Sequence, residues 1–195
     1  MRIQFVNKEQ FKTTEWSGGT TTEYFIYPEN SDYGKRDFSV RISSAKMDYD
    51  YSKFTHLPGV KRYLSPLTDK VGLSISGENI NLNPFEIVSF DGSDEVESFG
   101  QCRDFNLMLK DTNGSMESIT VNSGEADIHV PVNMIVAVFA WSDVILEIND
   151  EKRVTVNRDV LTIIYSDTDI EETIKISSMS EAKVLICKFE KKVVM

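Results

Sequence analysis

The sequence predicts an all-β protein, built as a sandwich or a barrel. Three observations favour this class. Apolar residues recur with a period of two, runs with helical spacing are scarce, and short strand candidates follow one another at regular intervals, separated by turn-like clusters of Asp, Asn, Gly and Ser. Of the 195 residues, 41% are hydrophobic and 27% are charged, which is typical of a folded globular protein.

Strand candidates can be placed in order along most of the chain. In residues 38–43 and 71–76, apolar side chains alternate with polar or small ones, so each segment would present one apolar face. The other candidates are residues 85–90, 104–109, 134–141, 144–148, 153–156, 160–165, 170–176 and 183–189. A tight hairpin is expected at Asn149-Asp150-Glu151, between two of these strands.

The most polar connection of any length covers residues 111–124, which are rich in Asn, Gly, Ser and Thr. We therefore expect two stacked β units, at residues 1–115 and 116–195. Unusual polar residues concentrate in the first unit, so we expect the chemistry to lie there.

Charge and patterning exclude several classes of partner. With 21 Lys plus Arg against 31 Asp plus Glu, the net charge is −10, which disfavours nucleic acid and anionic membranes because their phosphates would repel the chain. The first eleven residues lack an uninterrupted apolar core, and no stretch approaches the ~18 apolar residues of a membrane span. The two cysteines, Cys102 and Cys187, form neither a disulfide framework nor a zinc spacing. We expect a cytoplasmic protein.

Motifs of catalysis and metal binding are missing from the sequence. The two histidines, His56 and His129, form no His-x-His pair, so neither a metal nor a cofactor is expected. Any catalytic triad would have to use one of them as its base, and no Gly-x-Ser-x-Gly elbow, Walker loop or Gly-x-Gly-x-x-Gly is present. We therefore assign no catalytic residue.

The segment from Trp16 to Glu23 joins a large aromatic residue, a Gly pair and a Thr run that ends in a carboxylate. One interpretation is a Gly18-Gly19 turn that leads into an edge strand, with Thr present for its β propensity. The other is a backbone segment that approaches a ligand, with Thr22 and Glu23 as binding residues.

Two arginines are candidates for binding an anion. Strand alternation places Arg41 on the same face as Ser39 and Ser43, whose small side chains leave room for a guanidinium. Arg41 is either a cation inside a barrel, available to a carboxylate, or an outward-facing residue on a solvated face. Arg62 follows the Pro58-Gly59 turn.

A third polar group lies on the strand expected at residues 104–109. Asp104, Asn106 and Met108 share one face of this strand, and the carboxylate and the amide would need partners if they are buried. An internal network, with Asp104 paired to Arg41 or Arg62, is the structural alternative to ligand binding.

Taken together and in this order, these segments resemble the HutD/Ves family of bacterial cupin proteins. The matching pieces are Trp16-Ser-Gly-Gly-Thr with Glu23, Arg41-Ile-Ser-Ser-Ala45, Phe54 with Leu57-Pro58-Gly59-Val60-Lys61-Arg62, Phe90-Asp91-Gly92, and Asp104-Phe105-Asn106-Leu107-Met108. They cover about the first half of the chain. The second half matches by length and strand character only.

The resemblance implies a bicupin, in which two small antiparallel, jelly-roll-like barrels are packed in one chain and the metal-binding histidines of cupins are lost. One branch of the family accompanies the histidine-utilisation genes, where it is thought to act as a regulator or a metabolite-binding brake. Another branch is a stress- or cold-inducible protein of unknown activity.

The leading interpretation is therefore a metal-independent cupin that binds a small carboxylate metabolite and regulates histidine utilisation or a stress response. The expected ligand-binding residues are Thr22, Glu23, Arg41, Arg62, Asp104 and Asn106. Two other classes stay open: a metal-free isomerase or lyase with Glu23 or Asp104 as general base, and a protein-interaction module with an acidic surface rich in Ser and Thr. A homodimer formed through an exposed strand edge is also open.

Overall fold

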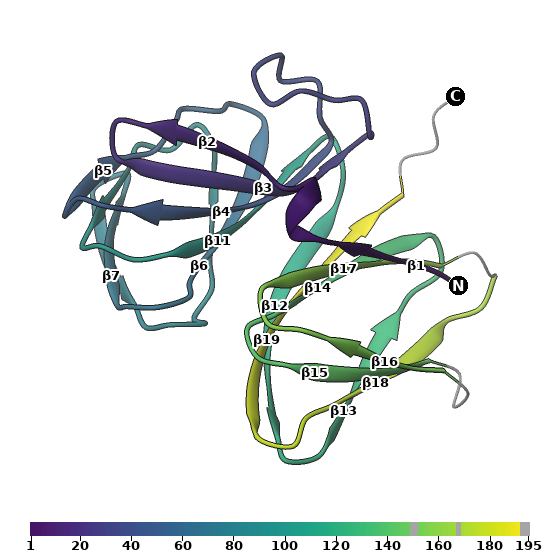
Figure 1. Ribbon diagram of the computed structural model, residues 1–195. Coiled ribbons are helices and arrows are strands. Elements are labelled where there is room, and N and C mark those ends of the chain that lie inside the picture. Colours follow the sequence, from purple (N-terminus) through teal and green to yellow (C-terminus); the bar gives the residue numbers. More distant parts are fainter. Residues whose placement is uncertain (149–151, 167–168, 192–195) are drawn as a thin grey trace. The chain divides into compact units, whose positions relative to one another are not determined.

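The computed structural model describes residues 1–148, 152–166 and 169–191, which form antiparallel β-strands and one turn of 3-10 helix, η1 (Lys8–Gln10) (Figure 1). The chain is all-β, as the apolar alternation predicts. It divides into two compact units, Gln10–Asn113 and Met1–Glu9 with Gly114–Met195. The expected division after residue 115 lies beside the observed one, but the first nine residues belong to the other unit. In the described residues, no helix is long and apolar enough to cross a membrane.

The N-terminal residues join the second unit because they add a strand to one of its sheets. Strand β1 (Arg2–Val6) pairs antiparallel with β17 (Val160–Tyr165), beside which it lies in Figure 1. Ile3 and Phe5 pack against the core of this unit, and the Arg2 guanidinium lies 3.9 Å from the centre of the Tyr165 ring. Short and half-exposed, this strand gives only a weak signal in the sequence.

The unit of residues 10–113 contains a six-stranded and a four-stranded sheet, each with antiparallel neighbours. The six-stranded sheet has the order β2 (Lys12–Trp16), β3 (Gly19–Tyr27), β4 (Val40–Met47), β11 (Asp104–Lys110), β6 (Val60–Pro66), β9 (Val88–Asp91). The four-stranded sheet has the order β5 (Tyr51–Lys53), β10 (Val96–Phe99), β7 (Val71–Ile75), β8 (Glu78–Leu82). One apolar cluster takes buried side chains from both sheets, among them Leu64 on β6 and Leu73 on β7.

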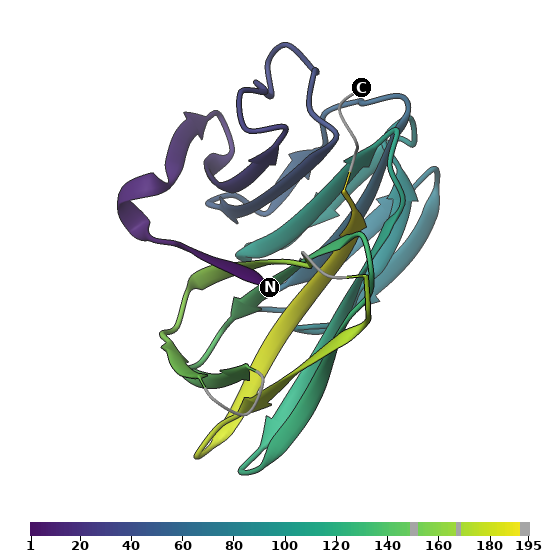
Figure 2. The same ribbon diagram turned by 90° about the vertical axis from the view of Figure 1, so that its right-hand side faces the viewer.

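The other unit also contains two sheets. The first has the order β1, β17, β14 (Met134–Ala140), β19 (Glu181–Glu190), β12 (Gly114–Asn122). The second has the order β13 (Glu125–Val130), β18 (Glu172–Ser177), β15 (Val144–Ile148), β16 (Lys152–Val156). Figure 2 shows β12 and β19 as long neighbours, paired from Gly114↔Phe189 to Asn122↔Glu181. Between the sheets lies a core of Val, Ile, Leu and Ala side chains.

Polar strands are the main difference between the expected and the observed elements. Residues 111–124 were expected to connect the two units, but most of them form β12, which buries Met116 and Val121 and pairs along its whole length with β19. The hairpin expected at Asn149-Asp150-Glu151 lies outside the described residues, although the flanking strands do pair, as far as Ile148↔Lys152.

Candidate functional site

Polar side chains gather on one face of the six-stranded sheet. Residues that lie directly opposite each other in an antiparallel pair share a face. Met108 on β11 lies opposite Arg62 on β6 and Arg41 on β4. Asn106 and Asp104 follow on the same face of β11 at intervals of two residues. The register therefore brings two arginines, an amide and a carboxylate to one side of the sheet.

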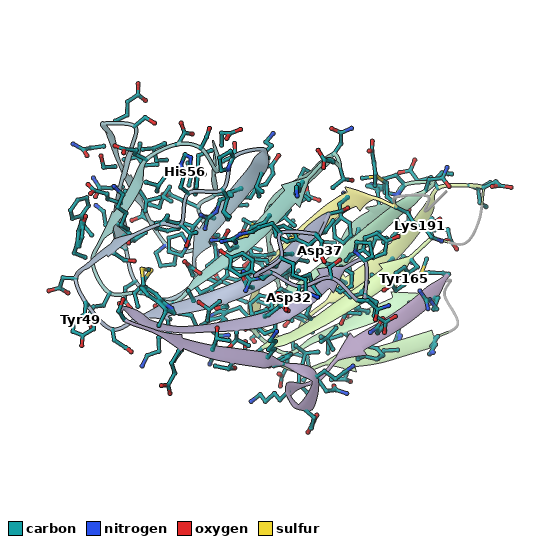
Figure 3. All side chains as sticks on the ribbon, turned by 90° about the horizontal axis from the view of Figure 1, so that it is seen from above. Asp32, Asp37, Tyr49, His56, Tyr165 and Lys191 are labelled. Atoms are coloured by element: carbon teal, nitrogen blue, oxygen red, sulfur yellow. The ribbon has the colours of Figure 1, made fainter. Side chains whose placement is uncertain are left out.

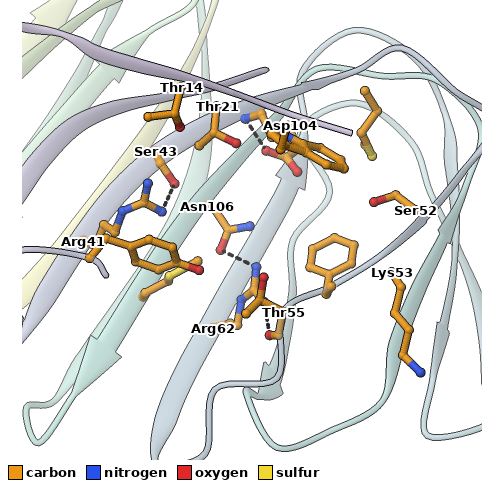
Figure 4. Close-up of a pocket in the computed structure, with 16 residues that line it drawn as sticks. Thr14, Thr21, Arg41, Ser43, Ser52, Lys53, Thr55, Arg62, Asp104 and Asn106 are labelled. Carbon is orange, nitrogen blue, oxygen red and sulfur yellow. Dashed lines mark hydrogen bonds between the residues drawn. The ribbon is translucent and has the colours of Figure 1, made fainter. Parts of the chain in front are cut away.

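This face lines a cavity of about 250 Å³, shown in Figure 4. The lining residues come from both sheets of the unit and from the segments between strands: Thr14, Trp16, Thr21, Tyr33, Arg41, Ser43, Ala45, Met47, Ser52, Lys53, Phe54, Thr55, Arg62, Asp104, Asn106 and Met108. The cavity is large enough for a small metabolite.

Arg41 has a carboxylate partner within the protein. Its Nε donates to Oε2 of Glu23 at 2.6 Å, and its Nη1 donates to Oγ of Ser43 at 3.0 Å. Both partners of the ion pair are largely shielded from water, with side-chain exposures of 6% for Arg41 and 13% for Glu23. The guanidinium also lies 4.1 Å from the centre of the Tyr33 ring. The positive charge of Arg41 is thus compensated before any ligand binds.

Arg62 is buried without such compensation. Its Nη1 donates to the backbone oxygen of Thr55 and its Nη2 donates to Oδ1 of Asn106. Both distances are 3.5 Å, which is long for a hydrogen bond. Its Nε has no hydrogen-bond partner among the described residues. No carboxylate in these residues lies at ion-pair distance from Arg62. The guanidinium packs against the rings of Phe54 and Phe90, 4.8 and 5.2 Å from their centres. Burial lowers the pKa of Arg62 to about 10, against the raising effects of the nearby Tyr33 and Asp104.

Asp104 is the buried acid of the cavity. Its Oδ1 accepts a hydrogen bond from the backbone nitrogen of Ala45 at 2.8 Å. Burial raises the pKa of Asp104 to about 6, against the lowering effects of that hydrogen bond and of the neighbouring arginines Arg62, Arg103 and Arg41. The ion pair of Asp104 with Arg41 or Arg62, considered from the sequence, does not occur in the described part of the chain, where Arg41 pairs with Glu23 instead.

The Thr run of β3 divides between the two faces of its strand. Thr21 lines the cavity, whereas Oγ1 of Thr22 lies 3.0 Å from Oγ1 of Thr13 on the neighbouring strand. Glu23 does not line the cavity itself but forms an ion pair with Arg41, which does. Of the six expected residues, the structure thus places Arg41, Arg62, Asp104 and Asn106 in the cavity wall, Glu23 behind it, and Thr22 on the other face.

Sequence reasoning missed Tyr33, which lines the cavity from the long loop between β3 and β4. Asp32 and Asp37, labelled in Figure 3, fix this loop: the Asp32 backbone nitrogen donates to Oδ1 of Asp37 at 2.7 Å, and Oδ1 of Asp32 accepts from the Gly34 nitrogen at 2.8 Å. Burial acts to raise the pKa of Tyr33, but hydrogen bonding to Arg36 and nearby positive charges lower it overall. A loop residue of this kind has no periodic signal in the sequence.

Trp16 forms part of the cavity wall at the β2–β3 turn and is 38% exposed. Its ring occupies the space above Gly18, where an added Cβ would lie only 2.0 Å from Cζ3 of the indole. The backbone of Gly19 has a φ of 150° and passes so close to β4 that its Cβ would lie 2.0 Å from the carbonyl oxygen of Lys46. Gly19 is therefore required at the turn, whereas Gly18 leaves the space that the indole occupies.

Metal-binding geometry is not found at the cavity or elsewhere in the described ranges, in which no three His, Cys, Asp or Glu side chains converge. His56 and His129 belong to different compact units. The polar groups of the cavity are arginine, amide, hydroxyl and carboxyl groups, which suit hydrogen bonding to an organic anion.

The family model described as HutD matches residues 8–184 of the sequence. The chain belongs to the HutD family. This membership agrees with the resemblance carried by the segments between Trp16 and Met108. No curated protein matches the sequence.

Solved structures resemble this HutD-family chain in fold. A conserved protein of unknown function, PA5104 from Pseudomonas aeruginosa PAO1, is 19% identical with a TM-score of 0.86, over 98% of this chain and 100% of that one. HutD from Pseudomonas fluorescens SBW25 is also 19% identical, with a TM-score of 0.76 over the same shares. A cupin 2 conserved barrel domain protein from Leptotrichia buccalis is 9% identical, with a TM-score of 0.60 over 96% of each chain. The fold is cupin-like.

Proposed function

We propose that this HutD-family chain is a bicupin that binds a small carboxylate-bearing metabolite, without a metal, in the cavity of residues 10–113. Two compact units, each with two antiparallel sheets, and the likeness to a cupin fold support the two-barrel arrangement. The observation that carries the binding function is the state of Arg62, which is buried at the cavity, has an unpartnered Nε, and lies beyond ion-pair distance of every described carboxylate.

A buried guanidinium without a carboxylate at ion-pair distance is unfavourable, because two long hydrogen bonds and two aromatic rings replace only part of the water that burial removes. A ligand carboxylate would restore the lost interaction through two parallel N–H···O bonds. Arg41 is less suited to this role because Glu23 already neutralises it at 2.6 Å. We therefore assign the carboxylate to Arg62, and to Arg41 a supporting role in which Tyr33 and Ser43 orient it.

The rest of the wall fits a small acid with an apolar part. Trp16, Met47 and Phe54 supply apolar surface, while Thr14 and Thr21 supply hydroxyl groups. Pockets of this composition, mostly apolar with a few placed polar groups, are typical of small-molecule sites.

The test is isothermal titration calorimetry and thermal shift on the full chain, with acetate, urocanate and formylglutamate as probes. We expect at least one acid to bind and to raise the melting temperature. Arg62→Gln should weaken its binding by about tenfold or more, since hydrogen bonds to a charged group contribute ~1.5–3 kcal/mol. Lys61→Gln, one residue away on the exposed face of β6, removes the same charge and should leave binding unchanged.

Equal loss of affinity in both variants would point to long-range charge rather than to a pocket. Normal affinity in Arg62→Gln would refute the assignment. The biological role that we propose, regulation of histidine utilisation or of a stress response, rests on family membership. It predicts that urocanate, a monocarboxylate, binds more tightly than acetate.

A second candidate function, a metal-free isomerase or lyase, is favoured by one observation. The pKa of Asp104 is about 6, close to neutral pH, where a carboxyl group can serve as general acid or base. Chemical conversion of a bound acid, followed by NMR and abolished in Asp104→Asn while binding persists, would establish it. Binding without conversion would leave the sensing role.

A further inference from the structure

Granted the carboxylate site at Arg62, we infer that the ligand is bifunctional: a monocarboxylate whose other end carries a hydrogen-bond donor, which Asp104 accepts. Asp104 is then the residue that determines specificity. Arg62, Asn106 and Asp104 appear in this order across the cavity in Figure 4, with Asn106 between the other two.

The cavity is polarised along strand β11. Met108 lies directly opposite Arg41 on one neighbouring strand and Arg62 on the other. Asp104 lies four residues from Met108 on the same face of β11. The Arg62 guanidinium reaches Oδ1 of Asn106, which is two residues from Asp104, so at ~3.3 Å per residue the cationic group and Asp104 are separated along the strand by roughly 7 Å. A ligand that follows this strand meets cationic side chains at one end and a carboxyl group at the other.

Asp104 has unused capacity as an acceptor. Among the described residues, the only hydrogen bond to its carboxyl oxygens is the one that Oδ1 accepts from the Ala45 nitrogen. An ionised carboxylate can accept about four hydrogen bonds. Since this carboxyl is buried at the cavity wall, a ligand N–H or O–H is the natural donor for its free positions.

The same residue discriminates against diacids. A second ligand carboxylate at the Asp104 end would bring a like charge beside a carboxyl group that is itself buried. Specificity then comes both from a favourable contact with a donor and from repulsion of a competing acid.

Three five-carbon acids test this inference by calorimetry on the full chain: pentanoate, 5-aminopentanoate and glutarate. Their far ends carry a methyl group, an ammonium group and a carboxylate, respectively. We expect 5-aminopentanoate to bind about tenfold or more tightly than pentanoate, because a hydrogen bond to a charged group is at stake, and glutarate to bind most weakly.

Asp104→Asn keeps an oxygen for the Ala45 nitrogen and nearly the same volume. It should remove the preference for 5-aminopentanoate and leave pentanoate affinity within about twofold. Asp69→Asn is the matched control, since it changes the net charge equally at an exposed position, and it should keep the wild-type order.

Two results would overturn the inference. If the three acids bind equally, with affinities that still depend on Arg62, the donor site is wrong and the carboxylate site stands. If the wild-type order of affinities persists in Asp104→Asn, a group other than Asp104 binds the far end of the ligand. Failure of all three acids and of the acids tested for Arg62 would refute both proposals.

Discussion

Replacing Asp104 by Asn should change the free energy of unfolding in a way that depends on pH. In the folded protein, burial raises the pKa of Asp104 to about 6, compared with an ordinary value of 3.8. Protonated Asp104 is therefore favoured by folding, and ionised Asp104 is disfavoured. Asn cannot ionise, so the variant lacks this dependence.

The sign follows from proton binding. Between pH 3.8 and 6 the folded state holds the proton and the unfolded state has lost it, so wild-type stability falls as the pH rises through this window. The stability that protonated Asp104 contributes is fully present below pH 3.8 and lost above about pH 6.

The magnitude follows from the same two values. Each pH unit between 3.8 and about 6 corresponds to about 1.4 kcal/mol, so the whole window corresponds to about 3 kcal/mol. The difference in unfolding free energy, Asp104→Asn minus wild type, should thus rise by about 2 kcal/mol between pH 4 and pH 7, which is most of this amount, and then level off.

Urea denaturation followed by tryptophan fluorescence is the assay. The chain contains two tryptophans, Trp16 and Trp141, of which only Trp16 lies in the compact unit of Asp104. A Trp141→Phe background therefore reports on the relevant unit. Asp69→Asn in that background controls for the altered net charge. A difference that stays constant from pH 4 to pH 7 would show that the pKa of Asp104 is not raised and would refute the reasoning.

Three further predictions concern the thiols, a turn and an ion pair. Both cysteines are buried, and burial raises their pKa, to about 12 for Cys102, so thiol reagents at pH 8 should label them only after unfolding; rapid labelling of the native protein would contradict this. Gly19→Ala should destabilise the protein by about 1–3 kcal/mol in urea denaturation, more than Gly72→Ala, whose added Cβ would make only ordinary contacts at 3.6 Å or more. Arg41→Gln should cost roughly 3 kcal/mol of stability because it leaves Glu23 unpaired, and the double variant with Glu23→Gln should recover part of it; additive losses would argue against coupling.

Strands with a sharp apolar alternation could be predicted from the sequence. The alternation in residues 38–43 and 104–109 corresponds to β4 and β11, the two central strands of the cavity sheet. Strand β12 could not be predicted, because its Ser, Thr and Asn residues have the composition of a loop and it is stabilised by nine residue pairs with β19, far away in the sequence. The pairing of β1 with β17 is likewise a long-range feature without a local signal.

In the candidate site too, local alternation predicts some residue positions, whereas others depend on the pairing of distant strands. Period two along β11 predicts that Asp104 and Asn106 share a face, and the structure places both in the cavity wall. In the Thr run of β3, no apolar neighbour distinguishes one face from the other, so the sequence could not separate Thr22 from Thr21. A shift of one residue reverses the face of a strand side chain.

Which arginine is free to bind an anion also depends on register. Arg41 and Arg62 occupy the same row across β4, β11 and β6, and their residue type alone makes them equivalent. They differ because β3 lies next to β4 and carries Glu23 to within 2.6 Å of Arg41, whereas β6 has β9 as its other neighbour and Phe90 lies opposite Arg62. One arginine therefore meets a carboxylate and the other an aromatic ring.

The distribution of buried charge between the two units is consistent with the ligand-binding role that we propose for Arg62. In the described residues, Arg41, Arg62 and Asp104 are the buried charged side chains, and all three lie in the unit of residues 10–113. The other unit has a core of aliphatic side chains and shows that this chain can fill a pair of sheets without buried charge. Because buried charges are unfavourable unless they are paired, the proposed ligand site gives a physical reason for the burial of Arg62 and Asp104 in one unit. A ligand that carries both a carboxylate and a donor would satisfy Arg62 and Asp104 together.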